Sequence, residues 1–255
     1  MTTESFVASP SGVLVAGNFR DNLIIDRHDP AFASMRASKL KHLRSENSED
    51  AVTWNVFRSL RQIHPAAWFP SLANVGLPGI PLVADDSIIV ELWRYIVPPP
   101  SLLRLGDEGH SEIDVVIESP AWVWFIEAKY RSDISTGTTT RPSRDQVLRN
   151  IDVGSYYAGV RSFYFSLLVS SRQASPLGCD AIEQYQDLSV PRKKLAEHRP
   201  DGLQNLQGIS LLTWSNLGYV LTVARKNARM SDEQGYAERA IEWLAKKGLM
   251  DAENS

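Results

Sequence analysis

One segment, AWVWFIEAKY from Ala121 to Tyr130, constrains the fold of this chain more than any other. Its first six residues are all apolar, and three of them are aromatic. A continuous apolar run of this length predicts a strand that is covered on both faces. The strand nevertheless ends with Glu127 and Lys129, a carboxylate and an ammonium with one residue between them. Charges at the end of a buried strand are costly unless they are paired, so the segment also indicates where a functional site lies.

The patterns on either side place this strand in a sheet. Strands are expected at 87–97, 112–118, 121–130, 163–170 and 208–214, helices at 49–63, 144–159, 179–199 (in two pieces), 215–228 and 231–248, and a proline-rich loop at 64–86. This order predicts an α/β fold in which a central mixed β-sheet is flanked by α-helices. We expect one domain over residues 1–255, with a core at about 45–170, an N-terminal extension (1–44) that adds an edge strand, and a C-terminal part (175–255) that completes or covers the sheet.

Composition excludes several classes of protein. The net charge of −3 means that any contact with nucleic acid has to come from local basic patches. The single cysteine, Cys179, forbids an intrachain disulfide, and the five scattered histidines give no zinc-finger spacing. We find neither a basic leader nor an apolar window of about 18 residues. The expectation is therefore a cytoplasmic protein without a membrane span.

The strands at 112–118 and 121–130 are expected to pair as a hairpin. The simplest register places Asp114 opposite Phe125 and makes Asp114 and Glu127 diagonal neighbours, with backbones about 7–8 Å apart. Two carboxylates this close repel each other and are hard to ionise together in a partly buried site. A divalent cation between them removes this conflict, so the sequence predicts a metal site at the end of the hairpin.

Magnesium suits such a site because it is a hard ion that binds carboxylate and carbonyl oxygens and keeps several waters. We expect Mg²⁺ (or Mn²⁺) to be held by Asp114 and Glu127, with the carbonyl of Ala128 as a further ligand. Lys129 is then placed to orient or help deprotonate a metal-bound water and to stabilise negative charge on a phosphate. A salt-bridged sheet edge, in which Glu127 and Lys129 are only solvated, is the competing interpretation.

Asp114 followed by Glu127-Ala128-Lys129 resembles the PD-(D/E)xK nuclease superfamily, whose members share the restriction-endonuclease-like fold. The order of helix, three strands, helix and strand from about residue 45 to 170 is similar to the core of that family. The proline of the motif is replaced by isoleucine here, and the resemblance does not extend beyond residue 175.

The resemblance implies a Mg²⁺-dependent endodeoxyribonuclease that hydrolyses phosphodiester bonds. It further implies an acidic residue on the first helix and a glutamine on the helix after the strand that ends in Lys129. Glu49 is preferred over Glu46 for the acidic residue, because Glu49 shares the apolar face of that helix. Gln146 is the expected glutamine. Asp114, Glu127, Lys129, Glu49 and Gln146 form the expected catalytic set, and Asp114, Glu127, Ala128 and Glu49 the expected metal ligands. DNA is the expected partner, in a setting such as phage defence, with a homodimer or a partner subunit possible. The alternative is a catalytically inactive module of the same fold that binds nucleic acid or assembles with other proteins.

Other features are open to two interpretations. Glu112 faces Glu127 in the assumed register, as a further ligand or as an exposed residue. Gln146, Arg149 and Asn150 share a helix face, which contacts either substrate or solvent. The loop at 131–144 either closes over substrate or is a plain connector. The basic clusters are phosphate contacts or ordinary solvated faces: Arg36, Lys39, Lys41 and Arg44; Arg192, Lys193 and Lys194; Arg225, Lys226 and Arg229.

Overall fold

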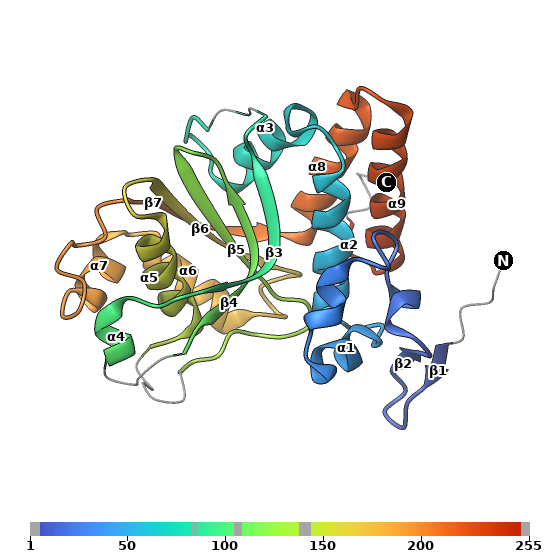
Figure 1. Cartoon of the computed structure of the whole chain (residues 1–255), viewed down its shortest axis with the longest axis horizontal. Helices are drawn as coiled ribbons and strands as arrows, with labels where there is room; N and C mark the ends of the chain where they lie inside the picture. Colours follow the sequence, from blue (N-terminus) through green and yellow to red (C-terminus); the bar gives the residue numbers. More distant parts are fainter. Residues whose placement is uncertain (1–5, 83, 85, 105–108, 138–143, 251–255) are drawn as a thin grey trace.

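The computed structural model describes residues 6–82, 84, 86–104, 109–137 and 144–250. At its centre lies a five-stranded sheet (Figure 1) made of β3 (Ile89–Ile96), β4 (Ser111–Glu118), β5 (Trp122–Ala128), β6 (Ser162–Val169) and β7 (Leu206–Thr213). The strands follow one another in sequence order; β4 is antiparallel to both of its neighbours, whereas β5, β6 and β7 are parallel. The prediction of an α/β fold with a central mixed sheet is confirmed.

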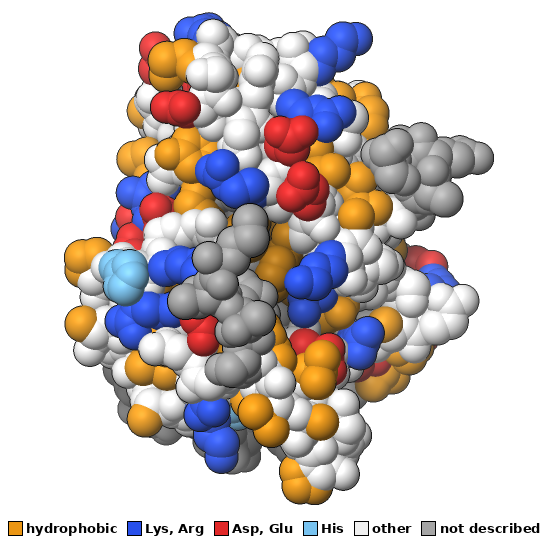
Figure 2. Space-filling view, turned by 90° about the vertical axis from the view of Figure 1, so that its right-hand side faces the viewer, with side chains coloured by type: hydrophobic (Ala, Val, Ile, Leu, Met, Phe, Trp, Pro, Cys, Tyr) orange, Lys and Arg blue, Asp and Glu red, His pale blue; other side chains and the backbone are white. Residues whose placement is uncertain are grey.

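Helices cover both faces of this sheet. One face is covered by α2 (Glu49–Arg61), α3 (Pro65–Gly76) and α8 (Trp214–Asn227), and α9 (Ser231–Lys246) packs outside them on α8 and α2. The other face is covered by α5 (Gln146–Ala158), α6 (Pro176–Tyr185) and α7 (Ser189–Leu195), and a short α4 (Pro100–Arg104) follows β3. On the side that carries α9 and the N-terminal elements, Lys and Arg side chains lie at several separate places among acidic and apolar ones (Figure 2). Among the described residues, no helix combines the length and the apolar character needed to cross a membrane.

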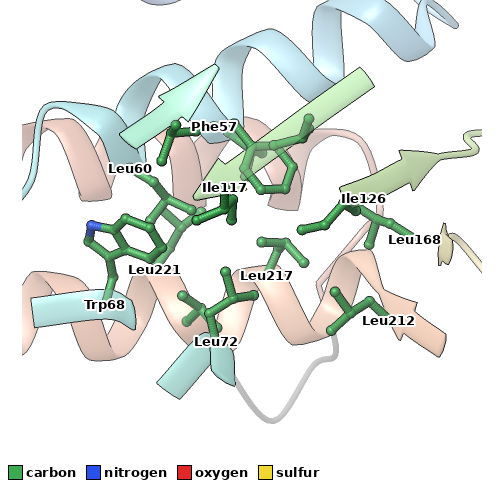
Figure 3. Packing of buried hydrophobic residues seen from close by; sticks show 14 of the residues in the cluster. Phe57, Leu60, Trp68, Leu72, Ile117, Ile126, Leu168, Leu212, Leu217 and Leu221 are labelled. Carbon is green, nitrogen blue, oxygen red and sulfur yellow. The ribbon is translucent and has the colours of Figure 1, made fainter. Parts of the chain in front are cut away.

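The larger core fills the space between the sheet and the helices α2, α3 and α8. Figure 3 shows side chains from these helices and from the strands that meet there: Phe57, Leu60, Trp68, Leu72, Leu217 and Leu221 from the helices, and Ile117, Ile126, Leu168 and Leu212 from the sheet. A second core lies between the sheet and α5. Successive side chains of a strand point to opposite faces, so Ile126 enters the first core and Phe125 the second. This double coverage explains why β5 is apolar on both faces.

The stretch at 64–86 was expected to be a loop, and this prediction is wrong for its first half, which forms α3. Pro65 stands at the first helical position, where a missing N–H costs nothing. Pro70 lies inside the helix and removes one backbone hydrogen bond. The helix still forms because Trp68, Phe69 and Leu72 are fully or almost fully buried in the core, and this burial outweighs the lost bond.

Over residues 6–44, the described part of the N-terminal extension, no strand is added to the central sheet, contrary to expectation. It contains β1 (Phe6–Ala8) and β2 (Leu14–Ala16), which form a separate two-stranded sheet, the short 3₁₀ helices η1 (Phe19–Asn22) and η2 (Pro30–Ser34), and α1 (Ala37–Leu43). Val15 of β2 also forms an isolated antiparallel bridge with Ser45. Buried amides fasten this extension beside α2: Asn22 Nδ2 donates to the carbonyls of Leu43 (2.8 Å) and Ser45 (2.7 Å), and Asn55 Nδ2 donates to the carbonyl of Asn22 (3.1 Å). The extension therefore lies near the N-terminal end of α2, where Glu49 is located.

Candidate functional site

The hairpin of β4 and β5 forms in a different register from the one predicted. Phe125 lies opposite Val116 instead of Asp114, a shift of two residues. An even shift leaves each side chain of β5 on its predicted face. Extending the observed register brings Asp114 level with Glu127, where a diagonal position was expected. The correction therefore brings the two carboxylate-bearing positions closer together.

The pairing of β3 with β4 is interrupted at Asp114. Ile113 and Val115 pair with β3, but Trp93, which lies opposite Asp114, does not pair and has φ of +56°. Such a conformation is strained for a bulky residue and is found most often near functional sites. The strand changes face here, since Val115 packs in the core under α2 whereas Ile113 packs in the core on the α5 side. At this kink the Oδ2 atom of Asp114 accepts a hydrogen bond from the N–H of Ala128 (2.9 Å).

Glu127 is more buried than Asp114 or Glu49, the other two acidic residues of the candidate site, with 3% of its surface exposed. Its Oε1 accepts hydrogen bonds from Lys129 Nζ (2.8 Å) and Gln146 Nε2 (2.5 Å), and its Oε2 accepts one from Asn150 Nδ2 (2.8 Å). Gln146 and Asn150 are four residues apart and so share one face of α5. The first turn of α5, which Asp145 caps, therefore fixes the position of this carboxylate.

Lys129 is a buried ammonium surrounded by carboxylates. Its Nζ lies 2.8 Å from Oε1 of Glu127 and 3.4 Å from Oε1 of Glu49. Burial alone lowers the pKa of Lys129, but the negative charges of Glu127, Glu49 and Asp114 outweigh this and raise the pKa above its ordinary value. In this state Lys129 is protonated at neutral pH. It is therefore suited to donate to water or to a phosphate oxygen, and not to act as a base.

Glu49 joins the first turn of α2 to the turn that follows β5. Its Oε2 accepts hydrogen bonds from the N–H of Tyr130 (2.8 Å) and the Oγ of Ser132 (2.6 Å), while its Oε1 faces Lys129. Arg131, between the two donors, has φ of +58°. This turn allows both of its neighbours to reach the same oxygen. Glu49 thus contacts the site through Lys129, which fits an indirect role better than direct ligation of a metal.

The site has more negative than positive charge. Asp114, Glu127 and Glu49 surround the single ammonium of Lys129, so two negative charges are uncompensated when all are ionised. The pKa of Asp114 is raised well above its ordinary value by burial and by the charge of Glu127. Asp114, Glu127 and Glu49 have six carboxylate oxygens between them. Five of these accept a hydrogen bond within the described part of the chain, and the sixth, Oδ1 of Asp114, accepts none there. A divalent cation would balance these charges.

The donor set suits a hard divalent cation such as Mg²⁺, which needs few carboxylates and keeps several waters. Asp114 and Glu127 would hold it. Ala128 lies between the charged residues with its N–H bonded to Asp114, and the use of its carbonyl as a further ligand stays a prediction. As the side chains stand, no three His, Cys, Asp or Glu residues in the described ranges are grouped as metal ligands. The fit therefore rests on two carboxylates and the charge balance.

Several other candidates are placed by the structure. Asn150, which the sequence singled out only as one member of a helix face, contacts Glu127, whereas Arg149 turns away and donates to the carbonyls of Gly109 (3.5 Å) and His110 (3.3 Å). Glu112 is not brought to the site, because it pairs with Lys39. The contact of Ser132 with Glu49 was missed, and no pattern in the sequence indicates it.

The loop at 131–144 is partly fixed. Asp133 accepts hydrogen bonds from the N–H groups of Leu177 and Gly178, both at 2.9 Å, and so binds the start of the loop to the first turn of α6. Arg144 is buried against Asp152 (2.6 Å), and Arg141 lies outside the described residues. The interpretation of the whole loop as a lid over substrate is therefore not supported at its two described ends.

No protein-family model, curated protein or solved structure gives a significant match to the chain. The geometry of the site is thus the basis for any functional conclusion.

Proposed function

We propose that the protein is a metal-dependent nuclease that hydrolyses phosphodiester bonds, with DNA as the expected substrate and Mg²⁺ or Mn²⁺ as the cofactor. One observation carries the proposal: α2 and the β4–β5 hairpin bring Glu49, Asp114, Glu127 and Lys129 together, with two negative charges in excess when all three carboxylates are ionised. Apart from the added helices α3 and α4, the order α2, β3, β4, β5, α5, β6 also agrees with the restriction-endonuclease-like core that the sequence resembles. A defence role and a partner subunit follow from the resemblance alone.

Each part of the site has a task in this chemistry. A bound Mg²⁺ supplies charge neutralisation at the phosphate and lowers the pKa of a coordinated water. Asp114 and Glu127 hold the cation, and Gln146 and Asn150 fix the rotamer of Glu127. Lys129 donates to a phosphate oxygen or orients the attacking water. Phosphoryl transfer depends mainly on positioning and charge stabilisation, which this set provides.

A second function, that of an inactive module which binds nucleic acid or assembles with other proteins, is favoured by a different observation. Every carboxylate oxygen of Glu127 and Glu49 already has a hydrogen-bond donor within the protein. Such a network does not need a metal ion to satisfy its carboxylates, so it is compatible with a site that has no catalytic activity.

Cleavage assays separate the two functions. Linear duplex, circular duplex, single-stranded DNA and RNA are incubated with the protein and Mg²⁺ or Mn²⁺. We expect cleavage of at least one substrate by the parent, and a loss of about 100-fold or more in Asp114→Ala and Lys129→Ala, because each removes charge stabilisation at the reacting phosphate. Lys193→Ala, an exposed change on α7, serves as the control and keeps full activity.

Two results would contradict the nuclease proposal. Equal cleavage by the parent and by folded Asp114→Ala and Lys129→Ala proteins would remove these residues from the reaction. Binding of nucleic acid without cleavage under all metal conditions would favour the inactive module. Circular dichroism of each variant shows whether it is folded.

A further inference from the structure

A cleft of about 850 Å³ opens beside Glu49. It lies between the N-terminal elements and the turn after β5, and residues from α1, from the segment 44–48, from the start of α2 and from 130–132 line it. A second cavity of about 450 Å³ is adjacent to this cleft, because His42 and Asp50 line both. Glu49 lines the cleft and also contacts Lys129, so the cleft and the candidate site share this side chain.

Three cations that line this cleft have no acidic partner among the residues that the structure describes. Arg44 is half-buried and donates from Nε to the carbonyl of Ala16 (2.7 Å). Lys41 and Arg131 both line the cleft and are exposed. Arg131 donates to Oδ1 of Asn47 (2.7 Å) and lies over the ring of Tyr130 (5.3 Å), and both of these groups are neutral. Lys39, by contrast, is paired with two carboxylates. Of the cations in the cleft without an acidic partner, Lys41 on α1 and Arg131 after β5 are therefore the two that are exposed.

The backbone at Arg131 gives independent support. Its φ of +58° allows the residues on either side to bind Glu49, and glycine would adopt this conformation without strain. A long cationic side chain is an uncommon choice at such a position. Its presence at the mouth of a cleft suggests that the guanidinium has a use there.

We infer that this cleft binds the phosphate backbone of the nucleic-acid strand that enters the site, with Lys41 and Arg131 as its phosphate contacts. The inference rests on the proposed function and adds the path of the substrate to it. Lys and Arg contacts to phosphate supply affinity that does not depend on base sequence. The basic cluster on α7 does not line this cleft.

Fluorescence anisotropy in EDTA tests the inference without turnover. Labelled duplex DNA, single-stranded DNA and RNA are titrated with the parent protein, and the tightest probe is used for the variants. Lys41→Gln with Arg131→Gly removes both charges, and glycine keeps the backbone turn. Lys193→Gln on α7 is the matched control. For a duplex, we expect the slope of log K against log salt to fall in magnitude by about 0.9 for each lost contact, with about tenfold weaker binding per contact near 0.1 M salt.

The outcomes distinguish this inference from the proposed function. Unchanged affinity and salt slope in the double variant, equal losses in the control, or no binding of any probe by the parent would overturn the cleft as a binding surface. If affinity is unchanged in the double variant, or if the control loses as much, cleavage by the parent would still support the nuclease proposal. Selective loss in the double variant, together with a parent that never cleaves, would keep the cleft and reject the nuclease.

Discussion

Lys129 places its ammonium among three carboxylates at the end of β5, and no other described lysine reaches them. A buried ammonium in this position takes the place that a divalent cation would take in balancing charge. Removing it leaves Glu127, which is almost fully buried, beside Asp114 with no positive charge between them. The response of such a protein to metal ions then reports directly on whether the site binds a cation.

We therefore expect Lys129→Met to lower the free energy of unfolding by about 3–5 kcal/mol in EDTA, the usual cost of breaking a buried ion pair. Millimolar Mn²⁺ or Mg²⁺ should restore part of this loss, about 2.7 kcal/mol when the metal is at 100 times its Kd. Urea unfolding with and without metal measures both effects. Lys193→Met, at an exposed position, should change little under either condition. If Lys129→Met lowers the free energy of unfolding by the same amount with and without metal, this result would argue against the metal site.

The residues of the site were predictable to different degrees. Glu127 and Lys129 were detectable because charges at the end of an apolar strand are unusual, and Asp114 because it lies on the partner strand within reach. Asn150 was less certain, since helix spacing alone could not show that it is buried while its neighbour Arg149 is turned away. Contacts such as that of Ser132 depend on a turn whose shape no local pattern specifies.

At the scale of elements, α5 reaches Glu127 because it packs unusually close to the sheet. A Cβ atom added at Gly154 would lie 2.1 Å from Cζ of Phe163 and 2.8 Å from Cδ2 of Phe125. These rings belong to β6 and β5 and are fully buried, so they have little room to move. The small residue therefore sets the distance between the helix that carries Gln146 and Asn150 and the strand that carries Glu127.

Gly154→Ala should destabilise the protein by about 1–3 kcal/mol through overpacking, although alanine is the better helix former by about 1 kcal/mol. Thermal or urea unfolding measures the change. Gly109→Ala is the matched control, because a Cβ at that position meets no atom within 4 Å and should have almost no effect. If Gly154→Ala were as stable as the parent, close packing of α5 would not be what fixes the geometry of the site.

Two errors in the predicted elements have physical causes. The proline content of 64–86 favoured a loop, but the tertiary burial of Trp68 and Phe69 in α3 outweighs the missing hydrogen bond at Pro70. The hairpin register was displaced because a shift by two residues leaves the apolar pattern of both faces unchanged. The pattern therefore contains no information that separates the two registers, and the tight turn at Pro120-Ala121 decides between them.

At the scale of the whole molecule, buried polar side chains join parts of the chain that local patterns cannot connect. Asp152 of α5 is fully buried. Its Oδ2 accepts from Arg144 Nη2 (2.6 Å) and is 2.8 Å from Nε2 of His198, and its Oδ1 accepts from Arg199 Nη1 (2.7 Å). This cluster fastens the segment after α7 to the helix that positions Glu127. The sequence predicted the helices but gave no sign of these contacts between residues far apart in the chain.

Asp152→Asn should lower the free energy of unfolding by about 3–5 kcal/mol at pH 7, because it breaks the buried ion pairs of this carboxylate with Arg144 and Arg199. Arg199 retains its pair with Asp201. Burial alone raises the pKa of Asp152, but the hydrogen bond from His198 and the charges of the two arginines hold it below its ordinary value. A lowered pKa in the folded state gives stability that is complete above the unfolded value, about 3.9, and is lost as the pH falls through the folded value. The difference in the free energy of unfolding between parent and variant should therefore be constant near neutral pH and become smaller below about pH 4.

Urea unfolding from pH 7 to pH 3 measures this difference. Asp180→Asn is the control, since Asp180 forms an exposed pair with Arg172 that contributes at most about 1 kcal/mol. A difference that stays constant down to pH 3 would show that the charge of Asp152 is not what holds the two segments together.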